Sequence, residues 1–80
     1  MNLRTAIGGT VREIRLSQGL TLRQLSSKSH IALGYLSEVE RGHKDASSQV
    51  LESIAEGLSL STYQLIKEIY EYLGETKWQR

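Results

Sequence analysis

The chain contains no cysteine and no proline in its 80 residues. Without cysteine it can form neither a disulfide nor a thiolate zinc site, so its small core has no covalent or metal cross-link of that kind. It also lacks the run of about 18 apolar residues that a membrane-spanning helix requires. Charges and glycines interrupt the first 15 residues too often for a signal peptide. We therefore expect a cytoplasmic protein with no membrane partner.

The sequence also lacks the residue patterns of catalysis. Its two histidines, His30 and His43, are not spaced for joint metal binding, and neither stands in a nucleophile-like arrangement with a serine or a carboxylate. Gly8 and Gly9 follow no strand, so they do not form a phosphate-binding loop. We expect no enzymatic activity, no metal, no cofactor and no small-molecule ligand.

The absence of proline and the shortage of β-branched runs favour an all-α chain. Apolar spacing predicts five helices, which with their caps cover about residues 4–18, 21–28, 33–41, 47–58 and 61–74. These helices are expected to form one domain over residues 1–74. The segment 75–80 lacks periodicity, and we expect it to be mobile.

The predicted helix ends rest on local capping signals. Thr21 with Gln24 and Ser61 with Gln64 match the capping box, and Ser47 is a candidate N-cap. Glycine readily takes the left-handed conformation that ends a helix, which assigns helix ends to Gly19, Gly42 and Gly74.

The paired glycines Gly8 and Gly9 fall inside the first predicted helix. Each costs about 1 kcal/mol relative to alanine in a helix interior. The pair indicates either a first turn that frays or a site where another chain packs closely.

The segment from Thr21 to Gly42 holds the main functional signal. It predicts two short helices joined by a turn at residues 29–31, with the apolar Ile31 in the turn buried. This is the helix-turn-helix layout, in which the second helix enters the major groove of DNA.

Charge is distributed unevenly along the chain. Residues 1–44 carry seven lysines or arginines against three glutamates, a net charge of +4. Residues 45–73 carry one lysine against five acids, a net charge of −4, and residues 74–80 carry +1. The pattern indicates different partners for the two halves or a random scatter of surface charge.

The pattern T-L-x-x-L, then H-I-x-x-x-Y-L-S-x-V-E-R-G, then L-x-x-I-A-x-x-L resembles the Cro/repressor (XRE) helix-turn-helix family over about residues 6–66. Within it, the segment LGYLSEVERGHKDASSQVLESI looks most like actinobacterial regulators of Clp protease genes. The resemblance implies a compact five-helix, lambda-repressor-like domain. The chain departs from the family at His30, where Gly or Ala is frequent, and at Ala46, where Pro is frequent.

The resemblance also implies which positions meet DNA. The third helix presents five residues to the base edges: Ala32, Leu33, Gly34, Ser37 and Glu38. None of them is one of the Arg, Lys, Asn or Gln residues that contact G or A through two hydrogen bonds, so direct base readout is expected to be sparse. The remaining specificity would come from the start of the second helix or from DNA shape. Expected phosphate contacts are Thr21, Arg23, Gln24, Tyr35, Arg41, His43 and Lys44.

Arg15 and Glu40 occupy the positions of a structural salt bridge in the family. We expect this pair here, holding the first helix against the third. The alternative is that both side chains face water.

The fifth predicted helix is apolar on more than one side, which favours self-association. The expected dimer interface consists of Tyr63, Ile66, Ile69, Tyr70, Leu73 and Trp78. The alternative is that its tyrosines lie flat on the surface with their hydroxyls in water.

These features predict a transcriptional regulator that binds a palindromic operator in double-stranded DNA as a homodimer, with RNA polymerase as a further candidate partner. The alternative is a protein-binding module of the antitoxin or anti-repressor type, whose C-terminal helix holds a partner.

Overall fold

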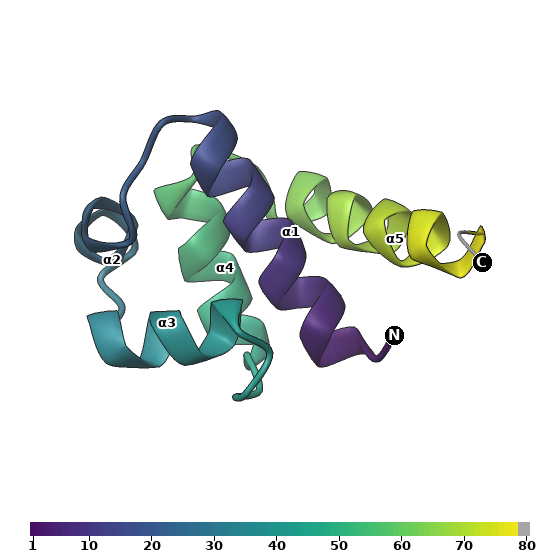
Figure 1. Ribbon diagram of the computed structural model, residues 1–80. Helices are drawn as coiled ribbons and strands as arrows, with labels where there is room; N and C mark the ends of the chain where they lie inside the picture. The colour runs from purple at the N-terminus through teal and green to yellow at the C-terminus, as the bar shows by residue number, and fades with distance from the viewer. Residues whose placement is uncertain (79–80) are drawn as a thin grey trace.

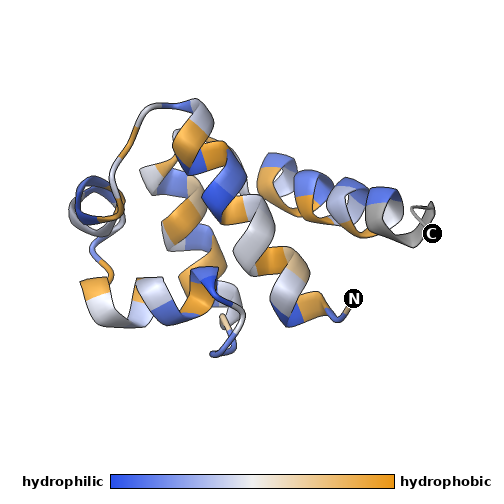
Figure 2. Ribbon diagram, viewed as in Figure 1, coloured by the Kyte–Doolittle hydropathy of each residue, from blue (hydrophilic) through white to orange (hydrophobic). Residues whose placement is uncertain are grey.

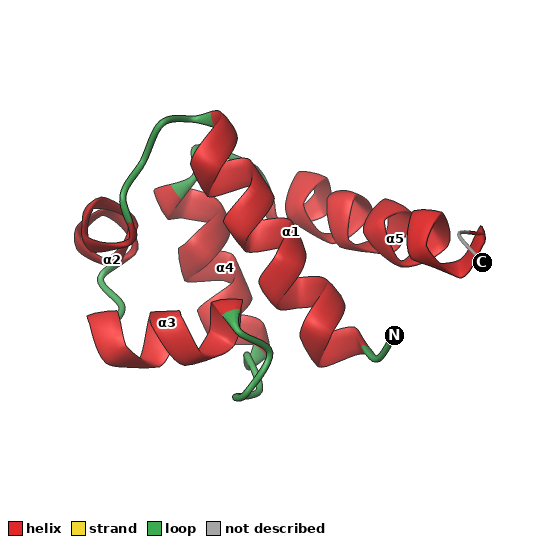
Figure 3. Ribbon diagram, in the orientation of Figure 1, coloured by secondary structure: helices red, strands yellow, loops and turns green. Residues whose placement is uncertain are grey.

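The structure, a computed structural model, describes residues 1–78 and the side chains of residues 1–75. Helices and connecting loops make up all of this part of the chain, and no strand occurs in it (Figure 3). The all-α, five-helix prediction is confirmed. The helices are α1 (Leu3–Ser17), α2 (Leu22–Ser29), α3 (Leu33–Glu40), α4 (Ser48–Gly57) and α5 (Thr62–Trp78).

The helices are arranged so that α2 and α3 lie at one end of the molecule and α5 at the other (Figure 1). Helices α1 and α4 occupy the middle, with α3 and α5 packed on α1, and α2 and α5 packed on α4. No helix in residues 1–78 is long and apolar enough to cross a membrane. The helix-turn-helix unit is thus separated from α5 by the body of the domain.

Most helix ends follow the predicted capping signals. The Thr21 hydroxyl accepts from the Gln24 amide at 3.0 Å, and the Gln24 side chain accepts from the Thr21 amide at 2.8 Å. Ser61 and Gln64 make the same reciprocal pair, and the Ser47 hydroxyl accepts from the Val50 amide. Such caps satisfy amides that have no partner within the helix. A further cap, Asn2 on α1, was not predicted; its side chain accepts from the Thr5 amide.

The predicted end of the last helix at Gly74 is wrong, because α5 continues to Trp78. Gly19 and Gly42 do take the left-handed conformation, with φ of 73° and 77°. Gly74 does not take the left-handed conformation, and it stays within the helix. Glycine permits a left-handed helix end but does not impose one, and no proline follows here to stop the helix. Residues 75–78 therefore extend α5, and residues 79–80 lie outside the described part.

The core forms where the apolar faces of all five helices meet. Five leucine and isoleucine side chains are fully buried there: Leu25, Leu36, Ile54, Leu58 and Leu65. Ile31, in the turn between α2 and α3, packs against this core but is only half-buried, so its predicted burial is partial. The core fixes the angle between α2 and α3 through residues of both helices.

The Gly8–Gly9 pair marks two close helix contacts within this chain. A Cβ atom on Gly8 would lie less than 3 Å from the carbonyl oxygens of Val39 and Glu40 at the end of α3. A Cβ atom on Gly9 would meet the ring of Tyr72 on α5. The first turn is helical, so fraying is not the role of the pair, and the close approach comes from α3 and α5 of the same chain.

Substitution of Gly8 by alanine should destabilise the domain, because the new methyl group would meet backbone atoms that cannot rotate away. We expect a loss of about 1–3 kcal/mol in the free energy of unfolding. Gly74→Ala is the matched control, since nothing lies within 4 Å of its Cβ position and the helix should gain up to about 1 kcal/mol. Urea denaturation of both variants measures this. Equal effects of the two substitutions would contradict the close α1–α3 packing.

Candidate nucleic-acid interface

The turn between α2 and α3 is held by local hydrogen bonds. His30 takes the left-handed conformation with φ of 59°, and its amide donates to the Ser26 carbonyl at the end of α2. The Ser26 hydroxyl donates to the Ile31 carbonyl on the far side of the turn. His is among the non-glycine residues that tolerate this conformation. The departure at His30 therefore leaves the helix-turn-helix geometry intact.

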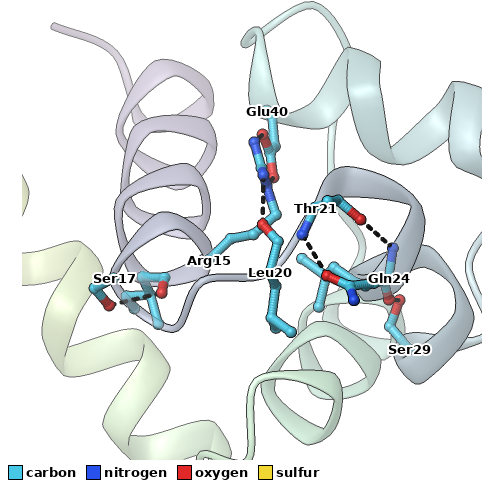
Figure 4. Close-up of polar contacts among 9 residues, drawn as sticks. Arg15, Ser17, Leu20, Thr21, Gln24, Ser29 and Glu40 are labelled. Atoms are coloured by element: carbon cyan, nitrogen blue, oxygen red, sulfur yellow. Dashed lines mark hydrogen bonds and ion pairs between the residues drawn. The ribbon is translucent and has the colours of Figure 1, made fainter.

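Arg15 of α1 and Glu40 of α3 form the expected ion pair, and it is bidentate (Figure 4). Arg15 Nε donates to Glu40 Oε2 at 2.7 Å, and Nη2 donates to Oε1 at 2.9 Å. Arg15 Nη1 also donates to the Leu20 carbonyl at 2.9 Å, just before α2. The hydrogen bond with Glu40 raises the pKa of Arg15 above its usual value, against the opposing effect of burial. One guanidinium thus ties α1, α3 and the entrance of α2 together.

Four of the five residues expected to face bases lie on the outer side of α3, and the fifth, Ala32, directly precedes the helix. Ala32 and Gly34 are exposed, whereas Leu33, Ser37 and Glu38 are half-buried. Nothing lies within 4 Å of the Cβ position of Gly34, so the backbone there is open to close approach. The core-facing side of the helix carries Leu36 and Val39, which are buried.

Glu38 makes an ion pair with Arg41 and a contact with the His43 ring at the end of α3. Its Oε2 atom lies 3.0 Å from Arg41 Nη2, and its Oε1 atom lies 3.1 Å from His43 Nδ1. The sequence assigns Glu38 to the bases and the other two residues to phosphates. In the free protein Glu38 contacts both of them.

The loop after α3 is fastened to the domain at Asp45. The Tyr35 hydroxyl donates to the Asp45 carbonyl, and Arg4 of α1 donates to the Asp45 carboxylate at 2.8 Å. The neighbouring Lys44 is exposed. Tyr35 therefore holds the loop in place in the free protein. Its hydroxyl would contact a DNA phosphate only where the loop also lies against the DNA.

The start of α2 supplies the other expected phosphate contacts. Thr21, Arg23 and Gln24 are all exposed there. The Gln24 side-chain oxygen is engaged in the capping box, and its amide NH₂ has no partner among the described residues. A helix N-terminus with exposed donors suits a phosphate oxygen.

A groove of about 560 Å³ lies between α1 and α3 and brings Arg12 to the interface. Arg12 is exposed and has no ion pair among the described side chains. Arg12 is not among the phosphate contacts expected from the sequence, although its spacing could have indicated it. Arg12 stands three residues before Arg15, so both lie on the face of α1 that meets α3. The groove is lined by Arg12, Arg15, Leu22, Ser37, Glu40, Arg41 and His43.

The profile of the helix-turn-helix family matches residues 11–65, which include all of α2, α3 and α4. The chain belongs to this family. The predicted membership of the XRE-type helix-turn-helix family is therefore confirmed.

Two relatives place the chain within the family. It is 47% identical over 58 residues to the transcriptional regulator ClgR of Mycobacterium tuberculosis, an alignment that covers 72% of this chain and 52% of that protein. The chain thus spans about half the length of this curated relative. The crystal structure of the clp gene regulator ClgR from Corynebacterium glutamicum superposes with a TM-score of 0.90 at 37% identity, covering 99% of this chain and 84% of that one. The predicted likeness to Clp gene regulators is confirmed.

A second kind of helix-turn-helix protein shares the fold. The restriction-modification controller protein C.Esp1396I superposes with a TM-score of 0.84 at 26% identity, covering 91% of this chain and 94% of that one. The lambda-repressor-like arrangement of this chain therefore recurs in a protein of a different named role.

Loss of the Glu40 carboxylate should destabilise the fold, because Arg15 would remain nearly buried without its counter-ion. We expect Glu40→Ala to lower the free energy of unfolding by about 3 kcal/mol. Glu13→Ala, which removes an exposed glutamate of α1, is the control and should change it by less than about 0.5 kcal/mol. Thermal and urea unfolding measure both. An unchanged melting temperature for Glu40→Ala would refute the structural role of the pair.

Arg12 should contribute a phosphate contact that the groove makes available. We expect Arg12→Ala to weaken DNA binding on all sequences and to reduce the slope of log affinity against log salt by about 1. Lys67→Ala removes a cation from α5 at the far end of the molecule and serves as the control. Fluorescence anisotropy across a salt series gives both quantities. Indistinguishable slopes for the two variants would remove Arg12 from the interface.

Proposed function

We propose that the chain acts as a transcriptional regulator and binds a palindromic operator in double-stranded DNA as a homodimer, with α3 of each subunit in the major groove. The observation that carries the proposal is the outer face of α3, which lies open beside a groove lined by basic side chains. Neighbouring half-sites would lie about one helical turn, ~34–36 Å, apart. Within this interface, Ala32, Leu33, Gly34, Ser37 and Glu38 face bases, and Thr21, Arg23, Gln24, Tyr35, Arg41, His43 and Lys44 face the backbone.

The apolar side chains on α5 support the dimer. Tyr63 and Tyr70 are each 74% exposed, and Ile66 is 45% exposed. Figure 2 shows hydrophobic segments running along α5 beside hydrophilic ones. An open apolar groove of about 220 Å³ adjoins this surface, between α5, the start of α1 and α4. A two-fold contact would cover such a surface on both subunits.

The remaining interface residues differ in their exposure. Ile69 is buried in the core of its own subunit and Leu73 is half-buried, although both line the apolar groove. Their contribution to a dimer would be at the floor of that groove. The side chain of Trp78 lies outside the described residues.

The names of the relatives indicate a class of genes that the chain would regulate. Both the mycobacterial and the corynebacterial relatives are called ClgR, and the latter is described as a clp gene regulator. We propose that this regulator controls genes of the same class, in the cytoplasm. RNA polymerase is a further candidate partner, for which we propose no contact surface.

A second candidate function rests on the same α5 surface. If the exposed tyrosines and Ile66 hold another protein instead of a second copy, the chain would act as a protein-binding module of the antitoxin or anti-repressor type. The acidic character of residues 45–73 would then select a basic partner.

Selection of duplexes from a random pool at several salt concentrations, run beside sedimentation of the free protein, tests the proposal. Enrichment of a palindrome with half-sites about one turn apart, by a dimeric protein, is the expected result. Binding that lacks sequence preference and disappears with salt would favour the protein-binding alternative.

Placing a charge on the α5 surface should separate the subunits without unfolding them. We expect Ile66→Lys to shift the protein to monomer and to weaken operator binding at least about tenfold, because the two half-sites are no longer bound together. Leu16→Lys is matched in charge, and Leu16 is similarly exposed, on α1 at 54%. Sedimentation equilibrium and anisotropy compare the two. A dimer that persists in Ile66→Lys would place the interface elsewhere.

A further inference from the structure

Glu38 is the one acidic residue among the five expected to face bases, and in the free protein its carboxylate contacts two neighbouring basic residues. Both of its carboxylate oxygens are engaged, one by Arg41 and one by His43. The Glu38 side chain is 34% exposed, whereas those of Arg41 and His43 are 59% and 62% exposed. The pairs therefore stand at the surface, within reach of a competing anion.

We propose that Glu38 determines specificity by masking Arg41 and His43 from the phosphates of non-operator DNA. The inference rests on the proposed function and deepens it. A carboxylate that occupies the Arg41 guanidinium and the His43 ring nitrogen lowers the affinity for DNA of any sequence, and only a sequence that accommodates the displaced carboxylate recovers the loss.

The physical reason is a competition between two kinds of anion. A phosphate that takes Arg41 or His43 displaces Glu38, whose bare carboxylate then faces polyanionic DNA. On non-operator sequences nothing compensates this repulsion. Where a cytosine lies opposite, its amino group can donate to the released carboxylate. Discrimination thus comes largely from a cost imposed on wrong sequences.

Glu38 does not mask the other two basic side chains of the groove, Arg12 and Arg15. Arg15 is nearly buried and committed to Glu40, and Arg12 has no ion pair among the described side chains. Glu38 therefore governs two of the four basic residues that line the groove. This arrangement also gives the sparse set of base-facing residues a way to discriminate without many direct contacts.

The test compares Glu38→Gln with Glu68→Gln in the full chain, by anisotropy on the selected operator and on a random-sequence duplex. Both variants lose one negative charge, and Glu68 lies exposed on α5, away from the interface. We expect Glu38→Gln to bind the random duplex about fivefold more tightly and the operator no more tightly than the wild type. Glu68→Gln should change both affinities by less than about twofold.

A double-mutant cycle distinguishes masking from a general charge effect. Arg41→Gln should weaken random-duplex binding by less than about twofold in the wild type, where Glu38 occupies Arg41, and by about fivefold in the Glu38→Gln background. Circular dichroism verifies that each variant is folded. Additive effects in the cycle, or equal gains from Glu38→Gln and Glu68→Gln on the random duplex, would overturn the inference and leave the proposed function standing.

The proposed function fails in a different way. If the wild type selects no sequence and Glu38→Gln also binds no duplex at low salt, DNA recognition itself is refuted, and the masking role with it.

Discussion

The geometry of the interface depends on one nearly buried guanidinium. Arg15 makes two hydrogen bonds to Glu40 and a third to the Leu20 carbonyl, so the first helix, the third helix and the entrance of the second are joined at one point. A charged pair removed from water is stable only when its hydrogen bonds are satisfied in this way. The Gly8 contact adds to the constraint, because it lets the α1 backbone approach the end of α3 closely. Together they fix the orientation of α3 relative to the rest of the domain.

The interface combines this rigid frame with exposed, exchangeable charge. Arg15 and Glu40 are nearly excluded from solvent, whereas Glu38, Arg41 and His43 are paired at the surface. The first set therefore suits a structural role, and the second can exchange partners when phosphate arrives. The half of the chain with a net positive charge carries both sets, and the proposed dimer surface lies on α5 in the half with a net negative charge.

Features set by neighbouring residues could be predicted from the sequence. The capping boxes at Thr21 and Ser61 need only residues three positions apart, and both formed as expected. The Arg15–Glu40 pair spans 25 residues, and only the resemblance to a known family made it predictable. The error at Gly74 arose because a glycine allows a helix end without requiring it.

Other features depended on tertiary packing. Nothing in the sequence near Gly8 and Gly9 says which elements approach them, and the answer, α3 and α5, required the folded chain. Arg12 and the Glu38 contacts were missed for a different reason. Their short spacings, three residues from Arg12 to Arg15 and from Glu38 to Arg41 and five from Glu38 to His43, were visible in the sequence but were not used. Exposed charged residues are common in any sequence. Only the position of Arg12 beside the groove indicates that it could contact DNA.

DNA should contact the surface formed by α2, α3 and the loop after α3, and not α5. Amide chemical shifts of the isotope-labelled protein, followed during titration with a duplex enriched by selection, test this directly. We expect the largest changes on residues 21–24 and 32–45, with little change along α5 beyond what dimerisation alone causes. Changes concentrated on α5, with α3 undisturbed, would contradict it.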